Sequence, residues 1–289
     1  MSYTAWMLIT AGLVGLSCGL VGVFLILRKT AMMADAISHT VLLGIVLAFM
    51  VTGELVGIHM LIGALLAGWL TAFLVQWFQT RGVQQEASIG IVFTTLFAIG
   101  VILISTSIGN AHLDIRHALM GEITFVPFHR WNVPMIGEVP SATLMLFVIL
   151  IVVIAAITLF YKEWKITSFD PALAASLGIP VLVMHYAFMG LLSLVTVASF
   201  DAVGAILVVA MLITPAATAY LWTDKLHVML WLSGILGVVA SLLGYAVALW
   251  LDTSISASMA FTTGLLFLIS FFVSPRHGLV SKWRVKAYS

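Results

Sequence analysis

The chain has 289 residues, of which 63% are hydrophobic and only 8% are charged, and its formal net charge is +1. Soluble domains carry roughly 25% charged residues, because a protein folded in water must cover itself with polar groups. The composition therefore excludes a water-soluble fold, predicts a surface that mostly contacts membrane lipid, and gives no sign of a nucleic-acid partner. Cys18 is the single cysteine and lies in an apolar run, so we expect a small buried hydrophobe and no disulfide framework.

Apolar stretches long enough to cross about 30 Å of hydrocarbon recur along the whole chain. Each should be helical, because backbone polar groups in lipid find partners only within a helix or a closed barrel, and these stretches do not alternate as barrel strands do. We expect an all-α, polytopic transmembrane bundle of about eight or nine spanning helices, forming one domain over residues 1–289. In chain order the predicted spans are 6–27, 31–52, 57–79, 86–107, 141–161, 180–199, 201–222, 226–250 and 257–274.

The first span is long enough to cross the membrane and no basic region precedes it, so we do not interpret it as a cleavable signal peptide. Gly12, Gly15, Gly19 and Gly22 form a helical stripe that permits close contact with another helix. The stripe also makes Gly15-Leu-Ser17-Cys-Gly19 match the G-x-S-x-G nucleophile pattern. That pattern requires a strand–turn–helix context, so we interpret the match as a coincidence and keep an intramembrane serine enzyme as the alternative.

Two ionisable residues lie in the second span, within the sequence Asp35-Ala-Ile-Ser38-His39-Thr40. Residues four apart share one face of a helix, so the Asp35 carboxylate and the His39 imidazole should lie one turn apart. A carboxylate oxygen with an imidazole nitrogen suits Mn²⁺, Zn²⁺ or Fe²⁺ better than Ca²⁺ or Cu⁺, and Ser38 and Thr40 add hydroxyls. The structural alternative is a pair that holds helices together near the membrane interface. Two ligands do not complete a site, so the others must come from other helices or a second subunit.

Basic residues follow every odd-numbered span, which makes those exits cytoplasmic by the positive-inside rule. The N-terminus would then lie outside the cell and the C-terminus inside. Arg116 and Arg130 oppose this weakly, because their loop also carries Asp114 and Glu122. The supporting residues are Arg28 and Lys29, Arg81, Lys162 and Lys165, Lys225, and Arg276, Lys282, Arg284 and Lys286.

Three further polar residues have structural interpretations. His59 lies near the outer start of the third span and should be interfacial. His185, inside the sixth span, is interpreted as a hydrogen-bonded packing residue and not as a ligand. Asp201 is predicted to be the N-cap of the seventh span.

Residues 165–180 form a cytoplasmic segment between the fifth and sixth spans. Ser168 or Asp170 can cap a helix there, Pro171 suits its first turn, and Gly178 would end it. The predicted helix of about two turns is too short to be stable alone, so it either caps a loop or docks into a soluble partner.

Absent motifs narrow the possible functions. There is no G-x-x-x-x-G-K-[ST], so the chain cannot cradle ATP phosphates by itself, and no H-E-x-x-H, which disfavours a membrane metalloprotease.

Three segments together resemble the manganese/zinc/iron permeases of bacterial ABC importers, the ABC-3 family. They are Asp35-Ala-Ile-Ser-His39, the segment Ser168-Phe-Asp-Pro to Gly178-Ile-Pro180, and the run from Ser199-Phe-Asp to Thr-Pro215-Ala-Ala-Thr-Ala219. The resemblance covers nearly the whole chain, and Met120-Gly121-Glu122 with the residues up to Pro127 is more similar to the manganese-type members.

The resemblance implies a type II importer-like permease of the bacterial plasma membrane, without an ATPase site of its own. It implies a dimer of permeases, identical or related, paired with cytoplasmic ABC ATPase subunits and an extracellular metal-binding lipoprotein or periplasmic protein. The transported ion would be Mn²⁺, with Zn²⁺ or Fe²⁺ as alternatives, and no permanent cofactor is expected. Asp35 and His39 match the family's intramembrane metal site. The coupling segment is 170–178, with Asp170, Pro171, Ala174 and Gly178.

Two other transport mechanisms remain open at this point. An ABC permease for a metal chelate would need a wide path without a close carboxylate–imidazole pair. An ion-coupled secondary transporter would use Asp35 and His39 as a proton relay and would need no ATPase, but the inverted repeats expected of one are not evident.

Overall fold

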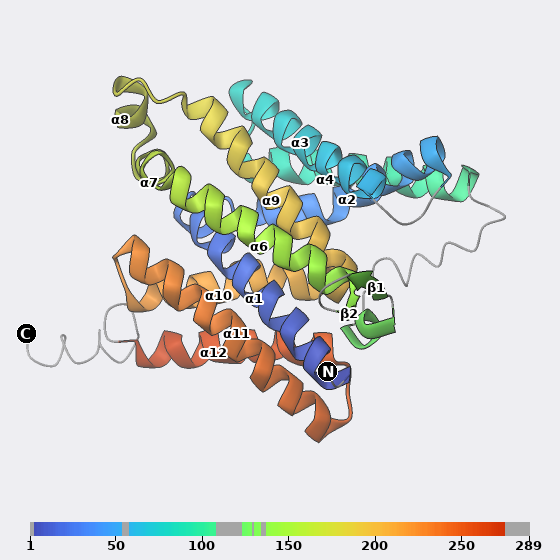
Figure 1. Ribbon diagram of the computed structural model, residues 1–289. Coiled ribbons are helices and arrows are strands. Elements are labelled where there is room, and N and C mark those ends of the chain that lie inside the picture. The colour runs from blue at the N-terminus through green and yellow to red at the C-terminus, as the bar shows by residue number, and fades with distance from the viewer. Residues whose placement is uncertain (1–2, 54–57, 108–122, 129, 134–136, 275–289) are drawn as a thin grey trace, which may run out of the picture.

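The computed structural model describes residues 3–53, 58–107, 123–128, 130–133 and 137–274 (Figure 1). Within these residues, nine helices are long and apolar enough to cross a membrane. This confirms the all-α prediction, and the ends of the helices lie within a few residues of the predicted ones. The nine helices are α1 (Tyr3–Leu27), α2 (Ala31–Thr52), α3 (Ile58–Thr80), α4 (Gln85–Ser107), α6 (Ser141–Leu159), α9 (Val181–Val203), α10 (Ala205–Trp222), α11 (Leu226–Leu251) and α12 (Ile255–Val273).

Smaller elements lie at the two ends of the bundle. At the end that holds the N-terminus are the 3₁₀ helix η1 (Ile123–Phe128) and the antiparallel hairpin of β1 (Arg130–Val133) and β2 (Gly137–Pro140). At the opposite end are α7 (Tyr161–Phe169) and α8 (Pro171–Ser176) (Figure 1). Helix α7 is not expected from the sequence, which predicts only a cytoplasmic segment from residue 165 onward at this place.

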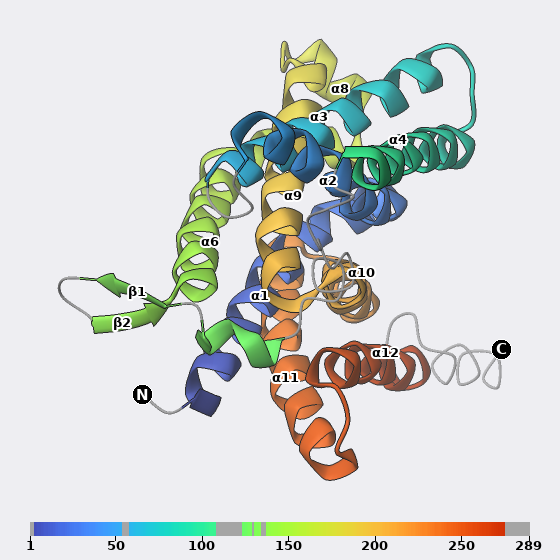
Figure 2. The same cartoon turned by 90° about the vertical axis from the view of Figure 1, so that its right-hand side faces the viewer.

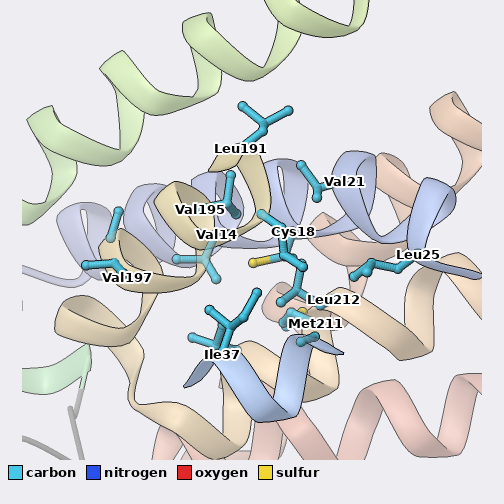
Figure 3. Close-up of a cluster of buried hydrophobic side chains, with 14 of the residues drawn as sticks. Val14, Cys18, Val21, Leu25, Ile37, Leu191, Val195, Val197, Met211 and Leu212 are labelled. Atoms are coloured by element: carbon cyan, nitrogen blue, oxygen red, sulfur yellow. The ribbon is translucent and has the colours of Figure 1, made fainter. Parts of the chain in front are cut away.

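Helix α1 runs through the middle of the bundle and packs against α6, α9, α10 and α11 (Figure 2). Its position follows from its composition, because it has almost no polar face. Cys18 is fully buried there, among side chains of α1, α2, α9 and α10 (Figure 3). It is a free cysteine whose Sγ lies 3.5 Å from Ser199 Oγ, which confirms its predicted role as a small buried residue.

The glycine stripe of α1 brings helix backbones into contact. A Cβ atom added to Gly15 would lie 2.6 Å from the backbone of Gly237 in α11, and one on Gly19 would lie 2.8 Å from the Ser233 carbonyl oxygen. A Cβ atom on Gly22 would likewise meet the backbone of Leu212 in α10, whereas one on Gly12 would have no atom within 4 Å. The stripe is thus confirmed at three of its four glycines. Close packing of small residues explains the G-x-S-x-G match without a nucleophile.

The break between α9 and α10 lies at Gly204 and not near Phe200. Gly204 has φ +81° and ψ 163°, an extended conformation with positive φ that a glycine adopts without steric cost, and its N–H donates to the Phe200 carbonyl. Asp201 is therefore inside α9, so its prediction as the N-cap of the next span is wrong. The glycine itself ends the helix, and no capping carboxylate is needed at that break.

Contacts between the ends of helices agree with the predicted orientation. Arg28, which follows α1, donates to the side chains of Thr167 and Ser168 in α7. Gln85 Nε2, at the start of α4, donates to the carbonyl oxygen of Lys29. The ends of α1, α3 and α6 therefore meet on one side, as the basic residues that follow these spans predict.

Candidate functional site

Asp35 and His39 lie together on α2, as their spacing predicts. His39 Nε2 is 3.5 Å from Asp35 Oδ1. Two aromatic side chains of α4 hold the imidazole ring: Phe93 is stacked on it at 5.8 Å between centroids, and Phe97 meets it edge-on at 5.6 Å. Helix α4 thus fixes the orientation of the histidine, which the sequence of α2 alone does not indicate. The signal in the sequence is the spacing of four residues between the two phenylalanines.

The distance between the two polar atoms fits shared coordination of one metal ion. Nitrogen and oxygen ligands lie about 2.0–2.2 Å from zinc-like ions, so two ligands at a tetrahedral angle are about 3.4 Å apart. The observed 3.5 Å between His39 Nε2 and Asp35 Oδ1 matches that separation, and it is longer than a good charge-assisted hydrogen bond.

The pair is open to its surroundings. Its side chains are 37% exposed for His39 and 38% for Asp35, although α2 is otherwise largely buried near this point. Among the residues that the structure describes, no group of three or more histidine, cysteine or carboxylate side chains could hold a metal ion. A complete coordination sphere therefore needs ligands from outside this set, and the exposure leaves room for them.

The hydroxyls of Ser38 and Thr40, which the sequence places near this pair, form hydrogen bonds with other groups. Ser38 Oγ donates to the Asp35 carbonyl oxygen at 2.7 Å, which is a bond within its own helix. Thr40 Oγ1 donates to the Ile37 carbonyl and accepts from Thr71 Oγ1 of α3 at 2.8 Å. Both side chains are buried, so neither joins the exposed Asp35–His39 pair.

His59 and His185, the two other histidines weighed in the sequence, lie apart from this pair. His59 is exposed at the start of α3, in agreement with an interfacial position. His185 packs against the ring of Tyr186 and lines a cavity with space for water of about 40 Å³. No hydrogen bond of His185 is seen within the described part of the chain. The other lining residues are Thr30, Met33, Ala72, Val75, Gln76, Gln79 and Gln85.

Helix α8 has the ends that its sequence predicts. Asp170 Oδ1 accepts a hydrogen bond from the backbone N–H of Leu173 at 2.9 Å, and Pro171 occupies the first turn. At the other end Gly178 has φ +78°, with hydrogen bonds from Gly178 N to the Ala175 carbonyl and from Ile179 N to the Ala174 carbonyl. This is a Schellman-type ending, so Asp170 and Gly178 define a single short turn of helix.

Helix α8 and the residues on either side of it present apolar side chains outside the spanning helices. Ala174 is buried against the protein, whereas Phe169, Leu173 and Leu177 are more than half exposed. Among the described elements, α8 makes its substantial contacts with α7 and α9. Exposed apolar side chains that gather beyond the spanning helices indicate an interaction surface.

Comparison with known proteins identifies the family. A model described as the ABC 3 transport family matches residues 1–274. The chain belongs to this family. Its relatives include the manganese transport system membrane protein MntD of Bacillus subtilis strain 168, which is 56% identical over 98% of this chain and 96% of the relative. The zinc transport system membrane protein TroD of Treponema pallidum strain Nichols is 39% identical over 96% of this chain and 76% of the relative.

Solved structures agree with this assignment to the ABC 3 transport family. PsaBC from Streptococcus pneumoniae, determined in complex with a Fab, matches with a TM-score of 0.81 and 35% identity, over 100% of this chain and 96% of the matched one. A metal-chelate type ABC transporter in an inward-facing conformation matches with a TM-score of 0.67 over 93% of this chain and 85% of that one; at 19% identity it supports the fold alone. This ABC 3 family permease is a multi-pass protein of the bacterial plasma membrane.

Proposed function

We propose that this chain is the membrane-spanning subunit of an ATP-driven importer for Mn²⁺. The observation that carries the proposal is the 56% identity to a manganese transport system membrane protein over nearly the full length of both chains. The Asp35–His39 pair supports it independently, because a carboxylate oxygen with an imidazole nitrogen suits Mn²⁺ and its neighbours in the first transition row. Zn²⁺ is the second candidate, since TroD, a relative at 39% identity, carries that ion in its name.

In this proposal Asp35 and His39 hold the ion during its passage. Their exposed side chains leave room for further ligands, which a second copy of the permease or a related one would supply together with water. Such a site must bind weakly enough to release the ion, and two protein ligands from one chain suit that requirement better than a closed cage. Metal reaches this site from an extracellular metal-binding lipoprotein or periplasmic protein.

The energy of ATP binding and hydrolysis would reach the permease through α8. Cytoplasmic ABC ATPase subunits would cover the exposed Phe169, Leu173 and Leu177, with Ala174 packed inward. ATP binds the two conformations of the complex with different affinity, and that difference shifts the permease between them. The Asp170 cap and the Gly178 turn keep the short helix formed before it meets the ATPase.

The substrate proposal is tested with the complex reconstituted into liposomes together with its ATPase and binding protein. We expect ATP-dependent uptake of Mn²⁺ and an ATPase rate that Mn²⁺-loaded binding protein stimulates more than the Zn²⁺- or Fe²⁺-loaded form. Stronger stimulation by zinc would replace manganese with zinc as the substrate. Uptake that continues without ATP and follows a proton gradient would support a secondary transporter instead.

The role of α8 is tested by removing its cap. Asp170→Ala should cost about 0.5–2 kcal/mol of helix stability, because Leu173 N–H loses its acceptor. We expect less ATPase to co-purify with the permease while the amount of permease in the membrane stays unchanged. Asp170→Asn, which keeps a capping oxygen, is the matched control and should restore assembly. Full assembly of the alanine variant would contradict docking through a preformed α8.

A further inference from the structure

Arg28 is a partly buried cation at the junction of α1, α7 and α9. Its Nε donates to Ser168 Oγ at 3.0 Å, its Nη2 donates to Thr167 Oγ1 at 3.2 Å, and its guanidinium carbon lies 4.5 Å from the ring centroid of Phe188. Burial lowers the pKa of Arg28 to about 10, so the side chain remains charged at neutral pH. Within the described ranges, no carboxylate lies close enough to Arg28 to form an ion pair. Hydroxyls and an aromatic ring are weak partners for a buried charge.

A carboxylate whose buried oxygen has no hydrogen-bond partner among the described residues lies on the same helix as the hydroxyls that Arg28 binds. Glu163 is four residues before Thr167 in α7, so the two share one helix face, and Thr167 Oγ1 also donates to the Glu163 carbonyl at 2.9 Å. Glu163 Oε2 is buried, and no described residue forms a hydrogen bond with it. The Glu163 side chain is therefore displaced from Thr167 by one helical turn, about 6 Å along the axis.

Within the described residues, Arg28 thus binds α7 one helical turn away from Glu163, and the two side chains do not form an ion pair. A buried carboxylate oxygen that lacks a hydrogen bond is costly, and such groups in native structures call for an explanation. A shift of α7 by one turn relative to Arg28 would join the guanidinium to Glu163 and release Thr167 and Ser168. One-turn displacements of packed elements occur in proteins that switch between two states.

Arg28 also lies between the two segments that the transport cycle must connect. On one side α7 leads through Asp170 directly into α8. On the other, Arg28 belongs to the short connection after which α2 begins at Ala31, four residues before Asp35. A movement of α7 would therefore displace Arg28, and with it the chain immediately before the helix that carries Asp35 and His39.

We propose that Arg28 is the positioning residue that couples movement of α8 to the Asp35–His39 helix, by exchanging the Thr167 and Ser168 hydroxyls of this conformation for the Glu163 carboxylate in the other. The inference rests on the proposed function. It assigns Glu163 a role that its position just after the fifth predicted span does not indicate. Each conformation has its own set of partners for Arg28, so the contact has two discrete arrangements. Both α8 and the Asp35–His39 helix can change the balance between these arrangements.

The first test measures the number of Mn²⁺ ions transported per ATP hydrolysed in the reconstituted complex. Arg28→Gln and Glu163→Gln should each lower this ratio by about tenfold, within the usual range of coupling between sites, while ATP hydrolysis continues. The double variant should transport no worse than either single variant, because both remove the same interaction. Arg81→Gln, at an exposed arginine stacked on Trp77, is the matched control and should behave as wild type. A normal ratio for Glu163→Gln, or losses that multiply in the double variant, would overturn the proposal.

The second test observes the exchange directly and does not depend on transport. Cys18 is the single cysteine, so Cys18→Ala gives a cysteine-free background for the pair Arg28→Cys and Glu163→Cys. Disulfide formation between these positions should rise several-fold when ATP and vanadate trap the nucleotide-bound state, whereas the control pair Arg28→Cys and Lys162→Cys, with position 162 exposed, should not respond. Equal yields in both states, with wild-type transport intact, would overturn this inference alone. If the wild-type complex transports no metal with ATP, the proposed function itself fails.

Discussion

Replacing both Asp35 and His39 with alanine is expected to abolish Mn²⁺ uptake. The two side chains present an oxygen and a nitrogen 3.5 Å apart, and they are the part of the coordination sphere that this chain supplies at α2. Loss of a partner outside the first coordination shell already costs roughly 10–100-fold in metal affinity, so loss of two ligands should lower the initial rate of uptake by more than about 100-fold. Each single alanine variant should show a smaller but clear loss.

The measurement is the initial rate of Mn²⁺ uptake per permease molecule, together with ATPase stimulation by metal-loaded binding protein. Ser38→Ala is the matched control on the same helix, because the Ser38 hydroxyl bonds only to the backbone of its own turn. It should transport as wild type. If the Asp35–His39 pair only holds helices together, the double variant will melt at a lower temperature and the surviving protein will transport normally. That result would move the metal site elsewhere.

Replacing Trp164 with alanine is expected to have the largest effect on stability. Trp164 is 1% exposed, and its ring lies 5.7 Å from those of Phe24, Phe160 and Phe188, which come from α1, the start of α7 and α9. Removing a large aromatic side chain from a packed core typically costs about 3–5 kcal/mol. Because this cluster joins α7 to the bundle, we expect the permease to melt earlier in detergent and to lose its association with the ATPase.

Two control substitutions separate packing from other effects of Trp164→Ala. Trp164→Phe should be tolerated better, since the indole N–H forms no hydrogen bond within the described residues and its loss leaves no partner unsatisfied. Trp231→Ala removes the same side chain from a position that is 75% exposed, so it should change stability by no more than about 0.5 kcal/mol. A melting temperature of Trp164→Ala equal to that of Trp231→Ala would contradict the role of the aromatic cluster.

The sequence by itself determined the spanning helices, because about 20 apolar residues in lipid have no alternative to helical hydrogen bonding. It also determined that Asp35 and His39 lie together, since the helical period places residues four apart on one face. The ends of α8 were equally local: Asp170 caps the backbone three residues ahead, and Gly178 takes the left-handed conformation. These features depend on neighbours a few residues away, so the sequence was sufficient to predict them.

The tertiary structure decided what depends on segments that are distant in sequence. It moved the break between α9 and α10 to Gly204, formed α7 as a separate helix, and placed Phe93 and Phe97 around His39. Arg28 illustrates the difference most clearly. From the sequence it marks only the cytoplasmic end of a span. In the fold its side chain is partly buried and donates a hydrogen bond to Ser168, 140 residues further along the chain. Packing between helices, which no local pattern encodes, decides whether a charged side chain faces water or contacts a distant helix.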